Sequence, residues 1–250
     1  MKVRNNIPME FSIRTTAHFS KSDRTLVIMA KAPKPGMVKT RLAQSLPVTA
    51  VTELYRCLLD DTIGLARSLQ DVEVAIMCPT SDVEDLSRVA GDGMRVVAQT
   101  GEGLAAGLTS VFAHFAATGR RVIAFNSDSP HLPPSVLEGA FEVLASRDVV
   151  VGPTHDGGYY LVGASTTHPD LFKGDGMGTT NALEALLARA RALQLSVHLT
   201  DPFYDIDLPD DLTRLVGDLQ LNPARAPRTA AWWAEWGRTL VEHRSSIGAP

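Results

Sequence analysis

The chain has 250 residues, 44% of them hydrophobic, which is enough to bury a core without disulfide or metal staples. Its formal net charge of −4 argues against general nucleic-acid binding, and no apolar run approaches the roughly 18 residues of a membrane span. The two cysteines lack metal-ligand spacing and indicate reduced thiols in a cytoplasmic protein. Alternating strand and helix patterns favour one α/β domain over two smaller ones.

Residues 1–24 carry several lysines and arginines but no continuous apolar stretch, so they do not resemble a secretory signal. We expect that these residues are either a disordered extension or a stretch that precedes the true start of the protein. An organelle-targeting leader is the alternative, although Glu10 and Asp23 count against it.

The first strand and the loop that follows it are the most informative stretch of the sequence. Residues 25–30 form an apolar run rich in β-branched side chains, and a loop containing two prolines and Gly36 ends it. Apolar residues at positions 38, 42 and 46 are spaced as in an amphipathic helix, which predicts a helix over 38–46.

Four cations lie within this loop and the first turn of the predicted helix: Lys31, Lys34, Lys39 and Arg41. Positive charge is usually unfavourable at a helix N-terminus, because the helix dipole already places partial positive charge there. A polyphosphate would satisfy both the free N–H groups of such a turn and the cations, whereas the alternative is a solvated basic loop without a ligand. Neither a Walker loop nor a GxGxxG fingerprint occurs in the chain.

The periodicity of apolar residues then predicts alternating helices and strands. They are a helix over 48–70, a strand over 72–78, a helix over 82–90, a strand over 94–98 and a helix over 104–118. Gly101, Gly103 and Gly107 lie where the last of these strands meets the last helix, and they allow close approach of a flat ligand or of a neighbouring helix. A glycine-rich turn explains the first two equally well.

A polar turn, residues 126–133, follows the strand predicted at 121–125. In open parallel sheets ligands bind beyond the carboxyl ends of the strands, so we expect Asp128 in this turn to face the cationic loop. One carboxylate beside bound phosphates suffices to hold Mg²⁺ or the similar Mn²⁺. Alternatively, Asp128 caps the helix predicted over 134–145.

Asp156 and Gly157 stand between two apolar runs and predict a β-hairpin. His155 in this turn fits a polar loop residue better than a general base, since no orienting partner is evident. The glycine-rich segment 174–181 suits either a lid over a substrate or a plain linker before the helix predicted over 182–193.

The segment after the last predicted strand is rich in aspartates. Asp205 or Asp207 could supply a second carboxylate to the cation, while Asp210 and Asp211 suit the first turn of the next helix, where negative charge is favoured. Residues 222–250 form a tail that contains all three tryptophans, which suggests docking on the body of the protein or on a second copy of the chain, as in a homodimer.

Four stretches of the chain resemble a bacterial family of nucleotide-diphospho-sugar-transferase-like proteins with the GT-A fold, DUF2064, which is itself similar to the 2-phospho-L-lactate guanylyltransferases. The stretches are MAKAPKPGMVKTRLA at 29–43, the Asp-Ser-Pro element at 128–130, DGGYYLVG at 156–163 and DIDLPDDL at 205–212. The last has Leu208 where threonine is usual. The resemblance implies a three-layer α/β sandwich with a mixed, mostly parallel sheet, in one transferase domain over residues 25–221.

The resemblance also implies site residues. The nucleotide would be bound by the first loop and the glycine-rich junction, at Ala30, Lys31, Gly36, Lys39, Arg41, Gln99, Gly101 and Gly103. The acceptor would lie beside Asp156, Gly157 and Tyr159, and the cation on Asp128 with Asp205 or Asp207. The residues expected to carry catalysis are Lys39, Arg41 and Asp128.

These assignments favour transfer of a nucleoside monophosphate from an NTP to a small phosphorylated acceptor. The run GTTNAL at 178–183 is similar to one in the guanylyltransferase relatives and lacks the tryptophan usual in the glycosyltransferase-like branch. Glycosyl transfer from a nucleotide-diphosphate sugar is the alternative, and a non-catalytic nucleotide-binding module is the second. A nucleotide and a small molecule are thus the expected partners, with no nucleic acid or membrane.

Overall fold

The computed structural model describes residues 22–116, 120–174, 176–177 and 179–247, with side chains described as far as residue 237. The extension predicted at 1–24 lies almost entirely outside the described residues, as do parts of the segment 174–181. The first strand begins at Arg24, one residue before the predicted start.

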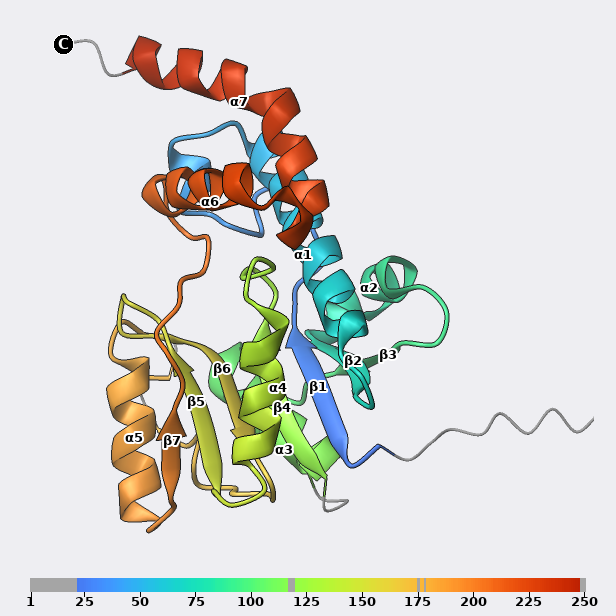
Figure 1. Ribbon diagram of the computed structural model, residues 1–250, viewed down its shortest axis with the longest axis vertical. Helices are drawn as coiled ribbons and strands as arrows, with labels where there is room; N and C mark the ends of the chain where they lie inside the picture. Colours follow the sequence, from blue (N-terminus) through green and yellow to red (C-terminus); the bar gives the residue numbers. More distant parts are fainter. Residues whose placement is uncertain (1–21, 117–119, 175, 178, 248–250) are drawn as a thin grey trace, which may run out of the picture.

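Seven strands form one sheet in the order β3-β2-β1-β4-β6-β5-β7. They are β1 (Arg24–Met29), β2 (Glu73–Cys78), β3 (Arg95–Ala98), β4 (Arg121–Asn126), β5 (Val149–Pro153), β6 (Tyr159–Ala164) and β7 (Val197–Leu199). Neighbouring strands are parallel except that β6 runs antiparallel to both β4 and β5. The mixed, mostly parallel sheet that the sequence predicts is confirmed (Figure 1).

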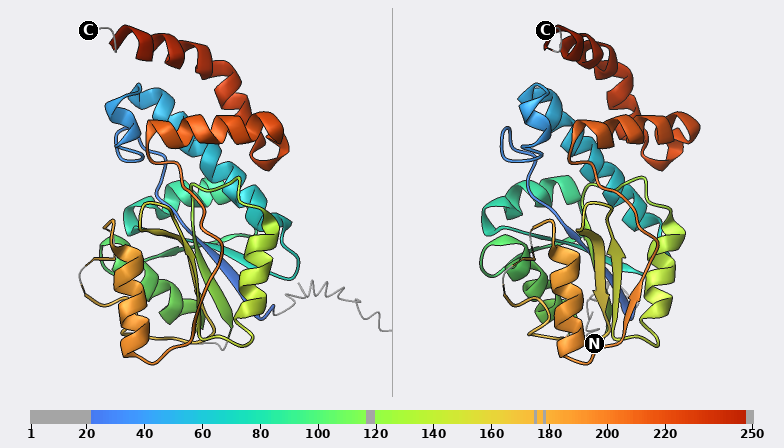
Figure 2. Two further views of the ribbon diagram at one scale, coloured as in Figure 1. Left: turned by 60° about the vertical axis from the view of Figure 1, so that its left-hand side comes forward. Right: turned by 90° about the vertical axis from the view of Figure 1, so that its left-hand side faces the viewer.

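Helices cover both faces of this sheet and complete three layers (Figures 1 and 2). One face packs on α1 (Val48–Ser68), α2 (Val83–Ala90) and α4 (Pro134–Val143), and the other packs on α3 (Gly103–Phe115) and α5 (Ala182–Ala192). In β1, Leu26 and Ile28 belong to one core and Val27 to the other, and all three are fully buried. A strand covered on both faces therefore has a continuous apolar sequence instead of an alternating one.

A third group of helices packs beyond the carboxyl ends of the strands (Figure 1). α6 (Pro209–Leu221) and α7 (Pro227–Ile247) pack with α1 around a separate apolar cluster that includes Leu54, Leu215 and Trp232. A short 3₁₀ helix, Pro223–Arg225, joins α6 to α7. The C-terminal tail thus packs on the body of the protein through α1.

Asp61 on α1 holds the first turn of α7. Its buried carboxylate accepts hydrogen bonds from the backbone N–H groups of Arg228 (3.1 Å) and Thr229 (2.8 Å) and from the Thr229 hydroxyl (2.8 Å). We expect Asp61→Ala to lower the free energy of unfolding by about 2 kcal/mol, because donors at a helix N-terminus lose their acceptor. Urea unfolding followed by tryptophan fluorescence measures this loss.

The neighbouring Asp60 provides the matched control. It is more exposed, and its contact with Arg228 Nε is a loose ion pair of 3.7 Å. We expect Asp60→Ala to cost less than about 1 kcal/mol. Equal losses for the two substitutions would contradict the capping role of Asp61.

The helix predicted over 38–46 is wrong. Within the described residues this segment forms only a turn and the short 3₁₀ helix η1 (Leu42–Gln44). Lys39 has a φ of +46°, which a right-handed helix does not allow. Leu42 and Leu46 nevertheless reach the cluster of α1 and α6, so their spacing marks residues that are buried together and not a helix.

The hairpin predicted at Asp156-Gly157 is confirmed, because β5 and β6 pair antiparallel around it. Gly157 has a φ of +89°, and a Cβ placed there would lie 2.0 Å from the backbone oxygen of Thr180. Only glycine fits between the hairpin and the segment that leads into α5.

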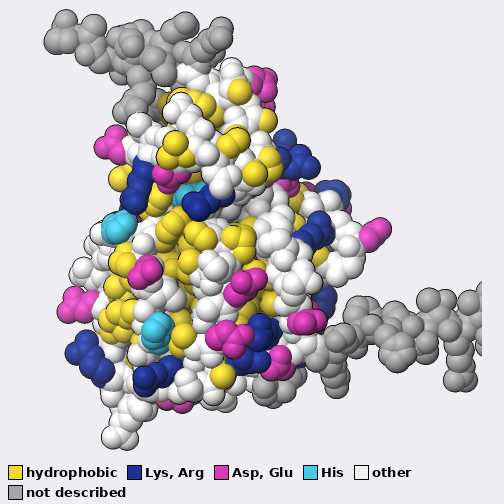
Figure 3. Space-filling model, in the orientation of Figure 1, with side chains coloured by type: hydrophobic (Ala, Val, Ile, Leu, Met, Phe, Trp, Pro, Cys, Tyr) yellow, Lys and Arg dark blue, Asp and Glu magenta, His cyan; other side chains and the backbone are white. Residues whose placement is uncertain are grey.

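Within the described residues, no helix has the length and apolar composition that crossing a bilayer requires. On the face shown in Figure 3, lysine and arginine side chains are dispersed among aspartates and glutamates. Apolar side chains fill much of the middle of this view. The described part of this face therefore presents no continuous basic surface.

Candidate active site

The cationic loop after β1 and the polar turn after β4 meet at the carboxyl edge of the sheet. The Lys39 ammonium donates to the Asp128 carboxylate and, over 3.1 Å, to Oδ1 of Asp207. Arg41 Nη1 lies 3.2 Å from Oδ2 of Asp207. The structure therefore brings together the three residues in which the sequence places catalysis and one of the expected metal ligands.

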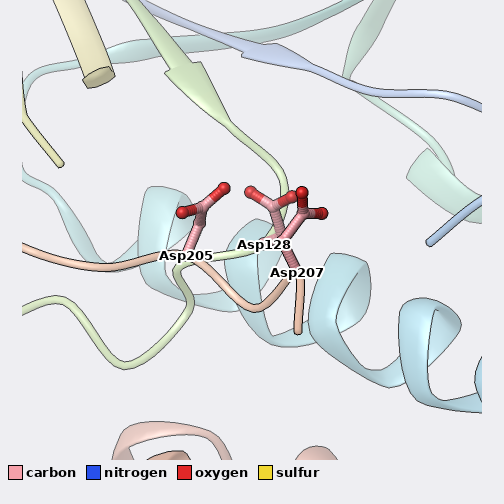
Figure 4. Close-up of side chains that lie close together, drawn as sticks. All are labelled: Asp128, Asp205 and Asp207. Carbon is pink, nitrogen blue, oxygen red and sulfur yellow. The ribbon is translucent and has the colours of Figure 1, made fainter. Parts of the chain in front are cut away.

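Three carboxylates surround this point. Asp128 belongs to the turn after β4, while Asp205 and Asp207 belong to the segment that leads from β7 to α6. Figure 4 shows the three side chains turned toward one another, and one oxygen of each lies within 4.8 Å of the other two. Such an all-oxygen set suits a hard divalent cation such as Mg²⁺ or Mn²⁺.

The three carboxylates differ in the oxygens they leave open. Asp207 uses one oxygen for Lys39 and the other for Arg41. Oδ1 of Asp128 is buried without a hydrogen-bond partner, and no hydrogen bond or ion pair to the Asp205 carboxylate forms within the described part of the chain. Asp128 and Asp205 are therefore the residues that fit a cation best.

Charge and burial shift the pKa values in this cluster. Burial alone would lower the pKa of Lys39, whose side chain is only 5% exposed, but Asp128 and Asp207 outweigh it and raise that pKa. Burial and the negative charge of Asp128 raise the pKa of Asp205 to about 7. Lys39 thus stays protonated, while Asp205 can take up a proton near neutral pH.

Hydrogen bonds fix the Asp128 turn to the segment that carries the other two carboxylates. Asn126 Nδ2 donates to Ser129 Oγ (2.9 Å), and the Ser129 hydroxyl donates to the Tyr204 carbonyl (3.1 Å). The Ile206 N–H donates to the Asp128 carbonyl (3.3 Å). These contacts set the separation between Asp128 and Asp205 before any ligand binds.

Tyr55 of α1 connects the same turn to the cationic loop. Its hydroxyl oxygen accepts the Lys31 N–H (3.1 Å) and lies 3.0 Å from Ser127 Oγ. Both Tyr55 and Ser127 are buried. The positions of the loop and the turn are therefore coupled through one side chain of α1.

His131, at the end of the same turn, is buried between aromatic rings. Its ring centroid lies 4.8 Å from that of Phe203 and 4.4 Å from that of Tyr204, and neither ring nitrogen has a hydrogen-bond partner in the described structure. Burial lowers the pKa of His131 to about 3. The folded chain therefore holds this imidazole neutral at pH values where the unfolded chain protonates it.

This lowered pKa predicts acid sensitivity. Since the unfolded state binds the proton below about pH 6.5, the contribution of His131 to stability falls as the pH drops below that value, whereas the raised pKa of Asp205 acts in the opposite direction. At pH 5 the loss is about 2 kcal/mol. His131→Phe keeps an aromatic ring and should remove this loss, as measured by urea unfolding at pH 7.5 and pH 5. His155→Gln, at an exposed position, should leave it in place; an unchanged pH dependence in His131→Phe would contradict the assignment.

A pocket of about 200 Å³ opens beside Asp128 and Asp205. Most of its wall is apolar and includes Met29 of β1, Leu104 and Leu108 of α3, Phe125 of β4 and Leu161 of β6. Its polar residues include Asn126 and Tyr159. Asn126 Oδ1 and the Tyr159 hydroxyl are buried without a hydrogen-bond partner, and burial raises the pKa of Tyr159, so its hydroxyl remains a donor.

Some residues of the first loop lie away from this centre. Lys34 pairs with Asp82 (2.8 Å) and Asp85 (3.2 Å) beside α2, so the expectation that all four cations require a ligand is wrong. The Ala30 side chain is buried in the core, while the Lys31 side chain and Gly36 are exposed.

The other expected site residues divide into two groups. Tyr159 lines the pocket, whereas the Asp156 carboxylate bonds to Thr154 Oγ1 (2.5 Å) and the Gly158 N–H (3.2 Å) within the hairpin. Gln99 is outside the pocket wall, and its Nε2 donates to the carbonyls of Gly101 (2.9 Å) and Gly103 (3.3 Å).

Sequence reasoning missed the residues that position the carboxylates: Tyr55, Ser127, Ser129 and Tyr204. Tyr55 has the spacing of an ordinary core residue of α1, and the others carry no spacing that reveals a partner from another element. Asn126 could have been found, because it lies at the end of a strand within the same turn as Asp128.

Residues 62–179 match the model of a family described as "Uncharacterized protein conserved in bacteria (DUF2064)". The predicted resemblance to this family is confirmed. The matched part contains Asp128, the pocket residues of α3 and the hairpin after β5. The search of curated proteins gave no match.

Solved structures of transferases have a similar fold. A proposed nucleotide-diphospho-sugar transferase from Desulfovibrio desulfuricans G20 has a TM-score of 0.82 and 26% identity, over 89% of this chain and 98% of that one. A 4-diphosphocytidyl-2C-methyl-D-erythritol synthase from Anaerococcus prevotii has a TM-score of 0.55 and 10% identity, over 79% of this chain and 97% of that one. A nucleotidyl transferase from Methanothermobacter thermautotroptrophicus has a TM-score of 0.53 and 18% identity, over 80% and 99% respectively. The last two share the fold alone, and together the three confirm the predicted nucleotide-diphospho-sugar transferase fold.

Proposed function

We propose that the protein transfers a nucleoside monophosphate from an NTP to a small phosphorylated acceptor, with Mg²⁺ or Mn²⁺ bound by Asp128 and Asp205. The contact between Lys39 and Asp128 carries this proposal, since it joins a cationic loop to open carboxylate oxygens at the edge where such sheets bind ligands. The free thiols of Cys57 and Cys78 support action in the reducing cytoplasm.

In this reaction an oxygen of the acceptor phosphate bonds to the α-phosphorus while the bond to pyrophosphate breaks, so negative charge grows on the leaving group. A bound divalent cation would supply neutralisation of the phosphate charges. Arg41, whose side chain is 56% exposed, can turn from Asp207 to the phosphates, and the buried Lys39 provides a fixed positive charge beside them.

Glycosyl transfer from a nucleotide-diphosphate sugar is a second candidate for the same site. The Desulfovibrio desulfuricans structure favours it, because that protein is described as a nucleotide-diphospho-sugar transferase and covers nearly the whole chain. Lys39 and Arg41 would then stabilise a departing nucleoside diphosphate instead of pyrophosphate.

One assay separates these functions. The protein is incubated with each NTP, Mg²⁺ and a pool of phosphorylated acceptors, and in parallel with nucleotide sugars. Release of pyrophosphate supports nucleotidyl transfer, and release of nucleoside diphosphate from nucleotide sugars alone supports glycosyl transfer. Thermal stabilisation by nucleotides without turnover would instead indicate a binding module.

A further inference from the structure

The pocket beside Asp128 differs in charge from the loop that holds Lys39 and Arg41. One Asp128 oxygen accepts from Lys39, while the other, Oδ1, has no protein partner and Asp128 also lines the pocket. Among the described residues, the pocket wall contains no lysine or arginine. Asp128 thus lies between a cationic region, suited to phosphates, and a pocket whose described wall carries no basic side chain.

The polar atoms of the pocket also restrict which ligand groups can bind there. Asn126 commits its Nδ2 to Ser129 and leaves Oδ1 as a buried acceptor, while the Tyr159 hydroxyl is a buried donor. A ligand hydroxyl can donate to Asn126 Oδ1 and also accept from Tyr159. A ligand carboxylate can only accept, so it would leave Asn126 unsatisfied and would lie close to Asp128 and Asp205.

We infer that this pocket takes the uncharged, hydroxyl-bearing body of the acceptor, such as a sugar or polyol, while the acceptor phosphate stays beside the carboxylates and Arg41. This inference rests on the proposed nucleotidyl transfer and narrows it to sugar or polyol phosphates, excluding phosphorylated carboxylic acids. The position of the pocket supports it, since the group attached to the reacting phosphate must lie directly beside Asp128 and Asp205.

Two pairs of probes test this directly, because the members of each pair differ only by a hydroxymethyl group against a carboxylate. They are glycerol 3-phosphate against 3-phosphoglycerate, and glucose 1-phosphate against glucuronic acid 1-phosphate. With NTP and Mg²⁺, we expect kcat/KM for the uncharged member of the better pair to be at least about tenfold higher. Equal values, or a preference for the acids, would overturn the inference.

Leu104→Arg should largely remove the preference. Leu104 lies on the pocket wall in the first turn of α3 and is 40% exposed, so an arginine can be accommodated there while its guanidinium enters the pocket. We expect kcat/KM for the acid member of each pair to rise by about tenfold relative to that of its uncharged partner. The matched variant Leu104→Gln, which adds polarity without charge, should leave the ratio near that of the unmodified protein.

The hydroxyl of Tyr159 provides a separate test. Tyr159→Phe should raise KM for the uncharged probes by about tenfold, because their hydroxyl loses a buried donor that has no partner within the described protein. Tyr160 also lines the pocket, but its hydroxyl lies 2.6 Å from Thr200 Oγ1 and donates to the Asp201 carbonyl (3.1 Å), so Tyr160→Phe removes a hydroxyl that is already partnered within the protein. A similar rise in KM for both variants would count against the pocket assignment.

Binding measurements without turnover separate a failure of the pocket assignment from a failure of the proposed nucleotidyl transfer. Calorimetry with Mg²⁺ compares glucose 1-phosphate with glucuronic acid 1-phosphate, whatever reaction the protein performs. Preferential binding of the uncharged probe, abolished in Tyr159→Phe, would support the pocket assignment even if no NTP is consumed and nucleotidyl transfer fails. Equal binding of the two probes, or binding of neither, would refute the inference itself.

Discussion

Replacement of Asp128 by asparagine should lower the rate of transfer by at least about 1,000-fold while leaving the fold intact. The substitution keeps the shape of the side chain but removes the charge that faces both Lys39 and the open side of the pocket. It should also weaken Mg²⁺ binding, because one of the two carboxylates with open oxygens is lost. Initial rates of pyrophosphate or nucleoside diphosphate release and Mg²⁺ titration by calorimetry measure the two effects.

The control for this experiment is Asp210→Asn. Asp210 is an exposed carboxylate in the first turn of α6, in the same acidic segment as Asp205 and Asp207 but outside the cluster. Its substitution should change the rate by less than about threefold, because it removes only a solvated charge. An Asp128→Asn protein that keeps a rate within tenfold of the unmodified protein would remove Asp128 from the chemistry.

The meeting of Lys39 with Asp128 was predictable because it depends on topology. Both residues follow strands whose apolar patterns are clear, and parallel neighbouring strands bring their carboxyl ends to one edge. The local path of the loop was not predictable in the same way. Leu42 and Leu46 are spaced as in a helix, but the left-handed backbone at Lys39 turns the chain, so the loop reaches Asp128 without the predicted helix.

The positions of the strands followed from apolar runs and hairpin signals, but their order did not. β6 lies between β4 and β5, and this arrangement depends on pairing across residues far apart in the sequence. The mixed sheet was expected only from the resemblance to a family. Likewise, nothing in the local sequence of Ser129 indicates that its hydroxyl bonds to Tyr204, 75 residues further along the chain.

The charge balance at the site also differs from the one that the sequence suggested. The four cations appeared to need an external anion, yet Lys34, Lys39 and Arg41 all pair with carboxylates of the protein. An arriving phosphate therefore competes with Asp207 for Arg41, and a divalent cation arrives beside a lysine. The site is closer to neutral than a basic loop alone would be.

Lys39→Met should therefore bind Mg²⁺ more tightly and yet be nearly inactive. The buried ammonium lies among carboxylates that a divalent cation would also neutralise, so its removal leaves a more negative cluster. We expect the Mg²⁺ dissociation constant at pH 8 to fall by about tenfold, the transfer rate to fall by at least about 100-fold, and the stability without Mg²⁺ to fall by about 3 kcal/mol. Millimolar Mg²⁺ should restore most of that stability.

Lys34→Met is the matched control, since Lys34 lies in the same loop but pairs with Asp82 and Asp85 and is 40% exposed. It should leave Mg²⁺ affinity unchanged and lower stability far less than Lys39→Met does. If Lys39→Met instead bound Mg²⁺ more weakly than the unmodified protein, the lysine would be supporting the metal site and not competing with it. The opposite signs expected for affinity and rate make this substitution informative, because general damage to the fold would lower both.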